Sequence, residues 1–322
     1  MRVCVTGGAG YIGAPAVEEL LAAGHDVTVL DSLIHRQDAV MARLAASGAR
    51  VVHGDVRDGA ARRAALAGAD AIAHLAAIVG DPACAREPAR SFAVNVAASR
   101  ALARDAAALG VRRLVFASTC SNYGRTAGDA PVDERAPLKP VSLYAEQKVT
   151  IERELLDRRD RGPAVTCLRF ATVYGVAARM RFDLTVNEFT RDLWAGRPLD
   201  VFGERFWRPY VHVRDAARAI RHALEAPPDR VVGRVFNIGR GDENYRKLDL
   251  VEVIVARLGR GDVRYVHRAE DPRDYRVSFE RIRTELGFVP ATRVPEGVDE
   301  VVAALESRRF GDPFSDRYGN AA

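Results

Sequence analysis

Residues 7–13 read GGAGYIG, and this glycine-rich turn is the stretch that determines the class of fold. It directly follows the apolar run RVCVT at residues 2–6, which is typical of a buried strand. A helical pattern over residues 11–23 follows it. A glycine turn between a strand and a helix brings backbone N–H groups to the positive end of the helix, where a pyrophosphate can bind. The stretch therefore predicts a dinucleotide site.

The glycines fit two spacings of the dinucleotide fingerprint. Gly8, Gly10 and Gly13 match GxGxxG, whereas Gly7, Gly10 and Gly13 match the looser GxxGxxG. Either spacing permits the tight turn and the close approach of the backbone to a phosphate. The residues by themselves leave both spacings open.

An acidic residue stands where such a fingerprint requires one. Asp31 ends the next apolar run, eighteen residues after Gly13, and its carboxylate is expected to accept hydrogen bonds from ribose hydroxyls. The same charge would repel the 2′-phosphate of NADP. NAD is therefore the expected cofactor, although Arg36 nearby keeps NADP as an alternative.

Short apolar runs and helical patterns alternate through the first half of the chain. Further apolar runs lie at 50–55, 70–77 and 112–118, and a long helix is expected over about 88–109. Repeated βα units with nearly continuous apolar strands predict an α/β fold with a Rossmann-type, doubly wound parallel sheet.

The pattern becomes irregular after residue 174, which indicates a second, smaller domain. We expect residues 1–174 plus about 209–238 to form the NAD-binding domain. A discontinuous C-terminal domain that binds the substrate would then consist of residues from about 175 to 208 together with 239–322.

Composition narrows the class of protein. The 322 residues are 28% charged and 48% hydrophobic, and the net charge of +5 comes from scattered basic residues, so we expect no nucleic-acid partner. No apolar run is long enough for a membrane span and no signal-peptide pattern opens the chain, so a cytoplasmic protein is expected. The cysteines Cys4, Cys84, Cys120 and Cys167 lack metal-ligand spacing, so no metal is expected.

A tyrosine and a lysine stand four residues apart in YAEQK, residues 144–148. On a helix this spacing places Tyr144 and Lys148 on one face. An ammonium beside a phenol favours the phenolate, which could exchange a proton with a sugar hydroxyl. An incidental pair on a solvated face is the alternative, but only three of the 48 basic residues are lysines.

These and further segments resemble the extended short-chain dehydrogenase/reductases of the nucleotide-sugar epimerase/dehydratase family. The resemblance spans most of the chain and rests on GGAGYIG, Asp31, GDVRD (54–58), HLAA (74–77), STCSNYG (118–124), YAEQK, LRFATVYG (168–175) and RPYVHVRD (208–215). It implies an NAD-dependent homodimer that removes hydride from a sugar carbon, usually C4, of a nucleotide-diphosphate sugar.

The resemblance also implies roles for single residues. Tyr144 would be the base, Lys148 would bind the ribose and lower the pKa of Tyr144, and Thr119 would bond the reacting sugar oxygen. A purely local role for Thr119, bonding nearby backbone, is the alternative. The cofactor would contact Gly7, Gly10, Tyr11, Ile12, Gly13, Asp31, Asp55, Val56, Leu75, Ala76, Ala77, Asn95, Tyr144 and Lys148. The substrate would contact Cys120, Ser121, Thr172, Asn187, Arg208, Arg273 and Arg276.

Two residues help to separate the members of the family. The 4,6-dehydratases that this chain resembles carry Asp-Glu after the Ser/Thr, whereas this chain carries Cys120 and Ser121. Because water elimination requires a strong acid and base, dehydratase is disfavoured. Cys120 lies one position before the acid/base cysteine of 3- and 5-epimerases and is expected to pack at a strand end.

The expected reaction is therefore C4 epimerisation through a 4-keto sugar with transient NADH. A nucleotide-4-keto-sugar reductase is the first alternative, and a non-catalytic NAD-binding regulator is an alternative of another class. Asn187 and Arg208 would contact the substrate phosphates, for which the planar guanidinium of arginine is suited. Thr172 stands where relatives often carry Asn, and Asp271 stands where the UDP-hexose epimerases carry an arginine, so the nucleotide stays open.

Overall fold

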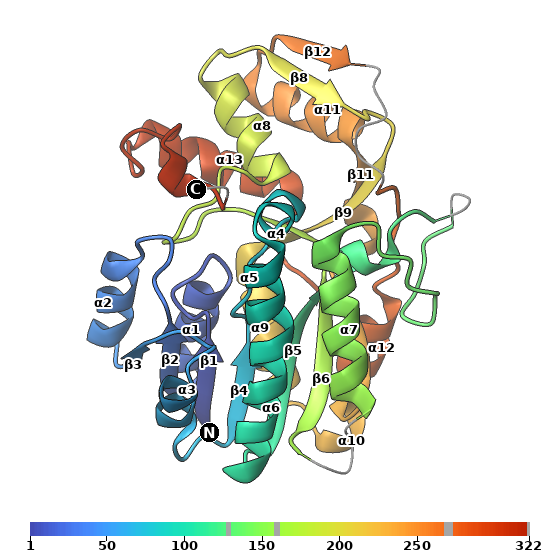
Figure 1. Ribbon diagram of the computed structural model, residues 1–322. Coiled ribbons are helices and arrows are strands. Elements are labelled where there is room, and N and C mark those ends of the chain that lie inside the picture. The colour runs from blue at the N-terminus through green and yellow to red at the C-terminus, as the bar shows by residue number, and fades with distance from the viewer. Residues whose placement is uncertain (127–129, 158–161, 267–272, 321–322) are drawn as a thin grey trace.

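The computed structural model describes residues 1–126, 130–157, 162–266 and 273–320 (Figure 1). Its central layer is a seven-stranded sheet in the order β10-β6-β5-β4-β1-β2-β3, in which all neighbouring strands are parallel. The strands are β1 (Arg2–Thr6), β2 (Asp26–Asp31), β3 (Arg50–His53), β4 (Ala71–His74), β5 (Arg113–Thr119), β6 (Ala164–Phe170) and β10 (Arg234–Ile238). The expected doubly wound parallel sheet is thus confirmed.

Helices cover both faces of this sheet because successive side chains of each strand point to opposite sides. Val3 and Val5 lie in one hydrophobic core, and Cys4 between them lies in the other. The first core is closed by α1 (Gly13–Ala22), α2 (Asp38–Ala46), α9 (Val213–Glu225) and α12 (Glu280–Leu286). The second is closed by α3 (Gly59–Leu66), α6 (Ser99–Ala108) and α7 (Leu143–Asp157).

Short helical segments complete this layer. They are α4 (Asp81–Arg86), α5 (Pro88–Phe92) and η1 (Ala93–Ala98) before α6, η2 (Cys120–Tyr123) after β5, and α10 (Pro228–Val231) before β10.

A smaller lobe lies across the carboxyl ends of the large sheet (Figure 1). It contains a three-stranded sheet of β7 (Thr172–Tyr174), β9 (Trp207–His212) and β11 (Asn244–Arg246), and a pair formed by β8 (Leu199–Phe202) and β12 (Val263–Val266). Its helices are α8 (Thr185–Trp194), α11 (Lys247–Leu258) and α13 (Val294–Glu306), with the short turns η3 (Gly241–Glu243) and η4 (Asp316–Tyr318). A third hydrophobic core joins α8, α11 and α13.

The strand order places a switch point next to β1. Strand β1 lies between β2 and β4. The loops that leave β1 and β4 therefore diverge and open a crevice, which is the usual position of a ligand in such sheets. The glycine turn at residues 7–13 lies at this crevice.

The chain crosses between the two parts more than once. β10 joins the large sheet, whereas residues 172–174 of β7 and 210–212 of β9 pair with each other in the small sheet. The division into an NAD-binding and a substrate-binding domain therefore stays a proposal whose borders run through β7 and β9.

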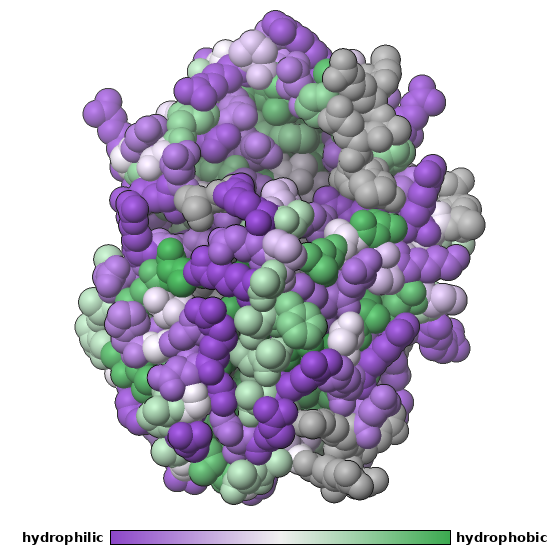
Figure 2. Space-filling view, viewed as in Figure 1, coloured by the Kyte–Doolittle hydropathy of each residue, from purple (hydrophilic) through white to green (hydrophobic). Residues whose placement is uncertain are grey.

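The surface of the face shown in Figure 2 is mostly hydrophilic, with smaller apolar groups between the charged side chains. Within the described ranges, no helix combines the length and the apolarity that a membrane crossing requires.

Candidate active site

A cavity of about 310 Å³ follows the carboxyl edge of the large sheet below the small lobe. Its walls include Asp31 at the end of β2, Asp55 in the loop after β3, and Thr119, Tyr144 and Lys148 from β5 and α7. The residues expected to bind the cofactor and those expected to act on the substrate therefore share one cavity.

The glycine turn forms one wall with Gly7, Gly10 and Gly13. Gly7 has φ of +73°, and a Cβ atom there would lie 2.8 Å from the backbone nitrogen of Ala76 in the loop after β4. A Cβ atom on Gly13 would lie 2.1 Å from the carbonyl oxygen of Gly7. Gly8 packs elsewhere, since its Cβ would meet Val29 at 2.8 Å. The looser spacing is thus the one that faces the cavity.

Asp31 is 7% exposed and held in a fixed orientation. One carboxylate oxygen accepts from the Ala9 N–H at 3.0 Å, and the other accepts from the Leu33 N–H at 2.9 Å. Burial raises the pKa of Asp31 above its ordinary value, and the two N–H groups act against this rise. Each oxygen keeps a further lone pair with which it can accept a bond from a hydroxyl.

Other residues expected at the cofactor also lie in the cavity wall, namely Tyr11, Ile12, Asp55, Val56, Leu75, Ala76 and Ala77. The Tyr11 hydroxyl donates to the carbonyl of Gly175 at 2.6 Å and so ties the glycine turn to the loop after β7. Asp55 pairs with Arg57 at 2.7 Å, and this hydrogen bond lowers the pKa of Asp55.

Tyr144 and Lys148 project from the first turns of α7. Lys148 is 5% exposed, and its Nζ donates to the carbonyl of Ala117 at 2.7 Å and lies 4.7 Å from the centre of the Phe116 ring. Burial lowers the pKa of Lys148 to about 8. The interpretation of these residues as an incidental pair on a solvated face is therefore wrong.

Burial raises the pKa of the Tyr144 phenol well above its ordinary value. The sequence led us to expect the opposite direction from the ammonium of Lys148 together with a positive nicotinamide. In the protein alone desolvation of the phenol dominates.

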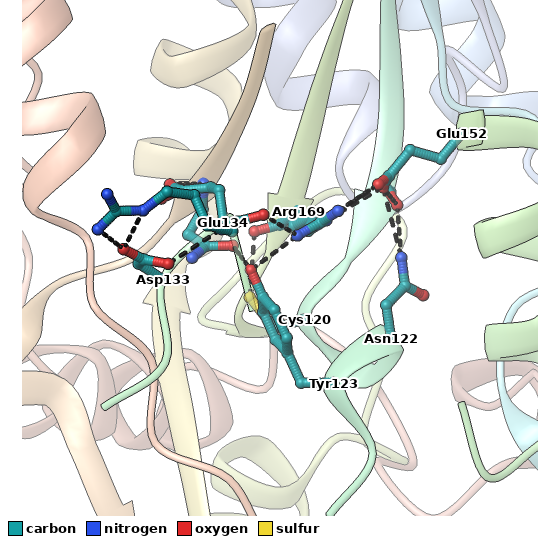
Figure 3. Close-up of polar contacts among 10 residues, drawn as sticks. Cys120, Asn122, Tyr123, Asp133, Glu134, Glu152 and Arg169 are labelled. Carbon is teal, nitrogen blue, oxygen red and sulfur yellow. Dashed lines mark hydrogen bonds and ion pairs between the residues drawn. The ribbon is translucent and has the colours of Figure 1, made fainter. Parts of the chain in front are cut away.

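Thr119 and Ser121 line the cavity beside Tyr144, and Cys120 between them does not face it within the described part of the chain. The Thr119 hydroxyl accepts from the Ser121 N–H at 3.1 Å, which leaves its hydrogen available to donate. The Cys120 thiol is fully buried and donates to the carbonyl of Arg169 at 3.2 Å (Figure 3). Burial raises the pKa of this thiol. The structure therefore agrees with packing of Cys120 at a strand end.

Asn95 lies behind the cavity wall, not in it. It sits on the π-helical segment η1, which interrupts the long helix expected over 88–109. Its amide accepts from the Ile78 N–H at 2.8 Å, donates to the Ile78 carbonyl at 3.0 Å and donates to Gln147 at 2.8 Å. Because the whole amide is engaged, Asn95 shapes the loop after β4, which does line the cavity.

Asn187 is also placed away from the cavity. It is fully buried on α8, where its side chain accepts from the Gly175 N–H at 2.9 Å and donates to Tyr11 and to the carbonyl of Arg181. A contact with substrate phosphate, as expected from the sequence, would require these bonds to break. In this structure Asn187 joins the two lobes.

Of the three arginines expected at the substrate, only Arg273 lines the described cavity, and Thr172 lies beside it in the wall. The guanidinium of Arg208 lies 5.2 Å from the centre of the Tyr275 ring, and that of Arg276 lies 4.4 Å from the centre of the Trp207 ring. Asp271 lies outside the described residues.

The sequence analysis missed several residues of the cavity wall. Asp81 at the start of α4 pairs with Arg273 at 3.1 Å, and Tyr275 lies next to Ser121, with 3.3 Å between their hydroxyl oxygens. Asn320 accepts from Arg179 at 2.7 Å and donates to the carbonyl of Val79 at 3.2 Å. No short motif marks these residues, because each pair is far apart in the chain.

The wall fits a dinucleotide. The turn can close only with glycine at positions 7 and 13, it lies in the cavity wall at the start of α1, and a fixed carboxylate stands at the end of β2. This combination matches a pyrophosphate followed by a ribose. Tyr144, Lys148 and Thr119 stand at the other end. The fold and the site together define a dinucleotide-dependent enzyme of the extended short-chain dehydrogenase/reductase class.

The chain belongs to the NAD dependent epimerase/dehydratase family, whose model matches residues 3–239. The UDP-glucose 4-epimerase of Corynebacterium glutamicum is 30% identical over 309 residues, covering 90% of this chain and 91% of that protein. The dTDP-glucose 4,6-dehydratase of Streptomyces niveus is 32% identical over 322 residues, covering 96% and 94%.

Among solved structures, DesIV, a dTDP-glucose 4,6-dehydratase from Streptomyces venezuelae with NAD and TYD bound, has a TM-score of 0.87 at 30% identity. The match covers 98% of this chain and 100% of that one. The protein is thus an NAD-dependent enzyme. Its relatives carry out two reactions, so the choice between them rests on the site.

Proposed function

We propose that this protein is an NAD-dependent nucleotide-sugar 4-epimerase. The observation that carries the proposal is the composition of the cavity wall after β5. Thr119 and Ser121 face the cavity there, and Cys120 is turned into the core.

Neither position offers the acid and base that water elimination requires. A carboxylic acid and a carboxylate stand at these two positions in the dehydratases that the chain resembles. Here Ser121 has no ionisable group in the neutral range, and the Cys120 thiol is buried and kept protonated. Asp81 is a carboxylate in the cavity, but it pairs with Arg273. These features support epimerisation over dehydration.

The roles of the side chains follow from their positions. Bound NAD would supply the acceptor and donor of hydride at C4 of the sugar. Tyr144 would take the proton of the C4 hydroxyl and return it, and Thr119 would donate a hydrogen bond to the same oxygen. Lys148 would bond the cofactor ribose and stabilise negative charge on Tyr144.

An epimerase must also keep its cofactor while the keto sugar turns over. The glycine turn, Asp31 and the loops after β3 and β4 would contact both halves of the dinucleotide, which supports slow release. We also propose that the enzyme works as a homodimer, which light scattering would measure.

The test uses purified protein with no added cofactor. UDP-glucose, UDP-glucuronate and dTDP-glucose, each deuterated at C4, are supplied in turn. We expect one of them to yield its C4 epimer with the deuterium still at C4. Stoichiometric consumption of added NADH or NADPH would indicate a reductase, and a 4-keto-6-deoxy product would indicate a dehydratase. NAD binding without turnover of a wider nucleotide-sugar panel would favour the non-catalytic regulator.

A further inference from the structure

A buried polar network (Figure 3) includes Glu152 on α7, the helix that also carries Tyr144 and Lys148. Its centre is the ion pair of Arg169 on β6 with Glu152 on α7, whose side chains are 5% and 2% exposed. Arg169 binds both carboxylate oxygens, at 2.5 to 3.2 Å. Figure 3 shows Arg169 between Glu152 on one side and Tyr123 and Glu134 on the other. An ion pair buried this deeply is stable only when its other donors and acceptors are also hydrogen-bonded.

Glu152 connects this network to the two elements that carry the reactive groups. It lies one helical turn beyond Lys148 on α7, and therefore on the same face. Its Oε2 accepts from the Ser118 hydroxyl at 2.5 Å. Ser118 stands between Ala117, whose carbonyl binds Lys148, and Thr119. The Glu152 carboxylate thus joins α7 to the end of β5, between the residue that binds Lys148 and Thr119.

Most of the titratable groups near Lys148 carry no charge at neutral pH. They come from β4 (His74), α4 (Cys84), β6 (Cys167) and α7 (Tyr144). Burial raises the pKa values of Cys84, Cys167 and Tyr144. It lowers the pKa of His74 to about 3. Among the described residues, Glu152 is the group near Lys148 that carries negative charge.

We propose that Glu152 is a positioning residue for Tyr144 and Lys148. Its carboxylate ties α7 to the end of β5 through Ser118, and its charge keeps Lys148 cationic inside the protein. Arg169 holds the carboxylate in its orientation through hydrogen bonds to both oxygens. This inference rests on the roles proposed above for Tyr144 and Lys148.

The charge of Lys148 can be measured directly because the chain has only three lysines. Protein labelled with ¹³C at the lysine ε-carbon gives one signal each for Lys139, Lys148 and Lys247. Lys139→Arg and Lys247→Arg assign the other two signals. The pH titration of the Lys148 signal needs neither substrate nor turnover. We expect its midpoint near pH 8, because burial lowers the pKa of Lys148 to about 8.

Glu152→Gln is expected to lower this midpoint, since it removes the negative charge one helical turn from Lys148. Glu146→Gln is the matched control. It makes the same change on the same helix, two residues from Lys148, but at an exposed position. It should leave the midpoint unchanged.

Glu152→Gln removes the carboxylate partner of Arg169 in the core and therefore destabilises the fold. The double variant Glu152→Met with Arg169→Met replaces the pair by apolar side chains and avoids this problem. Its Lys148 midpoint should also fall, because Glu152 lies one helical turn from Lys148 on α7, whereas Arg169 lies on the separate strand β6. An unchanged or raised midpoint in either folded variant would overturn the charge role of Glu152.

Ser118→Ala tests the hydrogen bond that joins α7 to β5 separately from the charge of Glu152. It should leave the Lys148 midpoint in place and reduce kcat severalfold on the substrate identified above. An unchanged kcat would overturn the tie. If the Lys148 midpoint moves as expected but no nucleotide sugar is epimerised, the proposed reaction fails and the charge role of Glu152 stands.

Discussion

The Nζ atom of Lys148 lies 5.9 Å from the centre of the Tyr144 ring, and its hydrogen bond goes to the carbonyl of Ala117. The ammonium is thus close enough to act on the phenol through its charge. Burial nevertheless raises the pKa of Tyr144 in the protein alone. The phenol would therefore become a base only when further positive charge enters the cavity, which links proton transfer to the presence of NAD.

Tyr144→Phe should reduce turnover at least a hundredfold, because it removes the proposed proton carrier at C4 and keeps the ring. NAD should stay bound, as measured by release of the nucleotide after denaturation. Tyr265→Phe, at an exposed tyrosine on β12, is the control and should match the wild type. A Tyr144→Phe enzyme with more than about a tenth of the wild-type rate would place the base elsewhere.

Cys120→Ala should keep most of the activity, since the thiol is buried against the carbonyl of Arg169 and does not face the described cavity. No solvent deuterium should enter C3 or C5 of the product, as read by NMR. Loss of activity together with deuterium at either carbon would instead establish a 3- or 5-epimerase mechanism.

Arg273→Met should raise KM for the nucleotide sugar about tenfold or more and change kcat less, because a charge-assisted bond to phosphate would be lost. Arg208→Met should raise KM less, since the Arg208 guanidinium does not line the described cavity but lies against the ring of Tyr275, which does. Arg205→Met, at a side chain that is 83% exposed, is the control. Steady-state kinetics distinguishes the three, and a larger KM effect at Arg208 would reverse the assignment.

Asn320→Ala should speed the loss of NAD severalfold. Asn320 bridges Arg179 of the small lobe and Val79 of the loop after β4 across the cavity wall. The fraction of protein that retains NAD after prolonged dialysis measures the effect. Asp316→Asn, at an exposed position of the same segment, should retain NAD as the wild type does. Equal retention in the two variants would show that the bridge does not hold the cofactor.

The cofactor half of the site could be predicted from the sequence because its signals are local. A strand, a glycine turn and a helix follow one another within residues 2–23, and the apolar pattern and glycine spacing of that short segment predict them. Asp31 ends a strand that pairs with β1, so its place beside the turn follows from the sheet. The spacing of Tyr144 and Lys148 needed only the period of one helix.

The sequence left two glycine spacings open, and the tertiary structure separated them. Gly7 faces the loop after β4 and Gly8 faces Val29 of β2, so the choice depends on which neighbouring strand each residue meets. A local pattern contains no information about that neighbour.

The substrate side depended still more on long-range contacts. Asn187, Arg208 and Arg276 have residue types that suit a diphosphate, yet the structure engages them with Tyr11, Tyr275 and Trp207. The sequence by itself determined the sheet, the dinucleotide turn and the reactive helix, since these follow from periodicity and backbone geometry. Only the tertiary structure decided which side chains face the cavity, because that depends on partners more than sixty residues away in the chain, such as Tyr11 for Asn187.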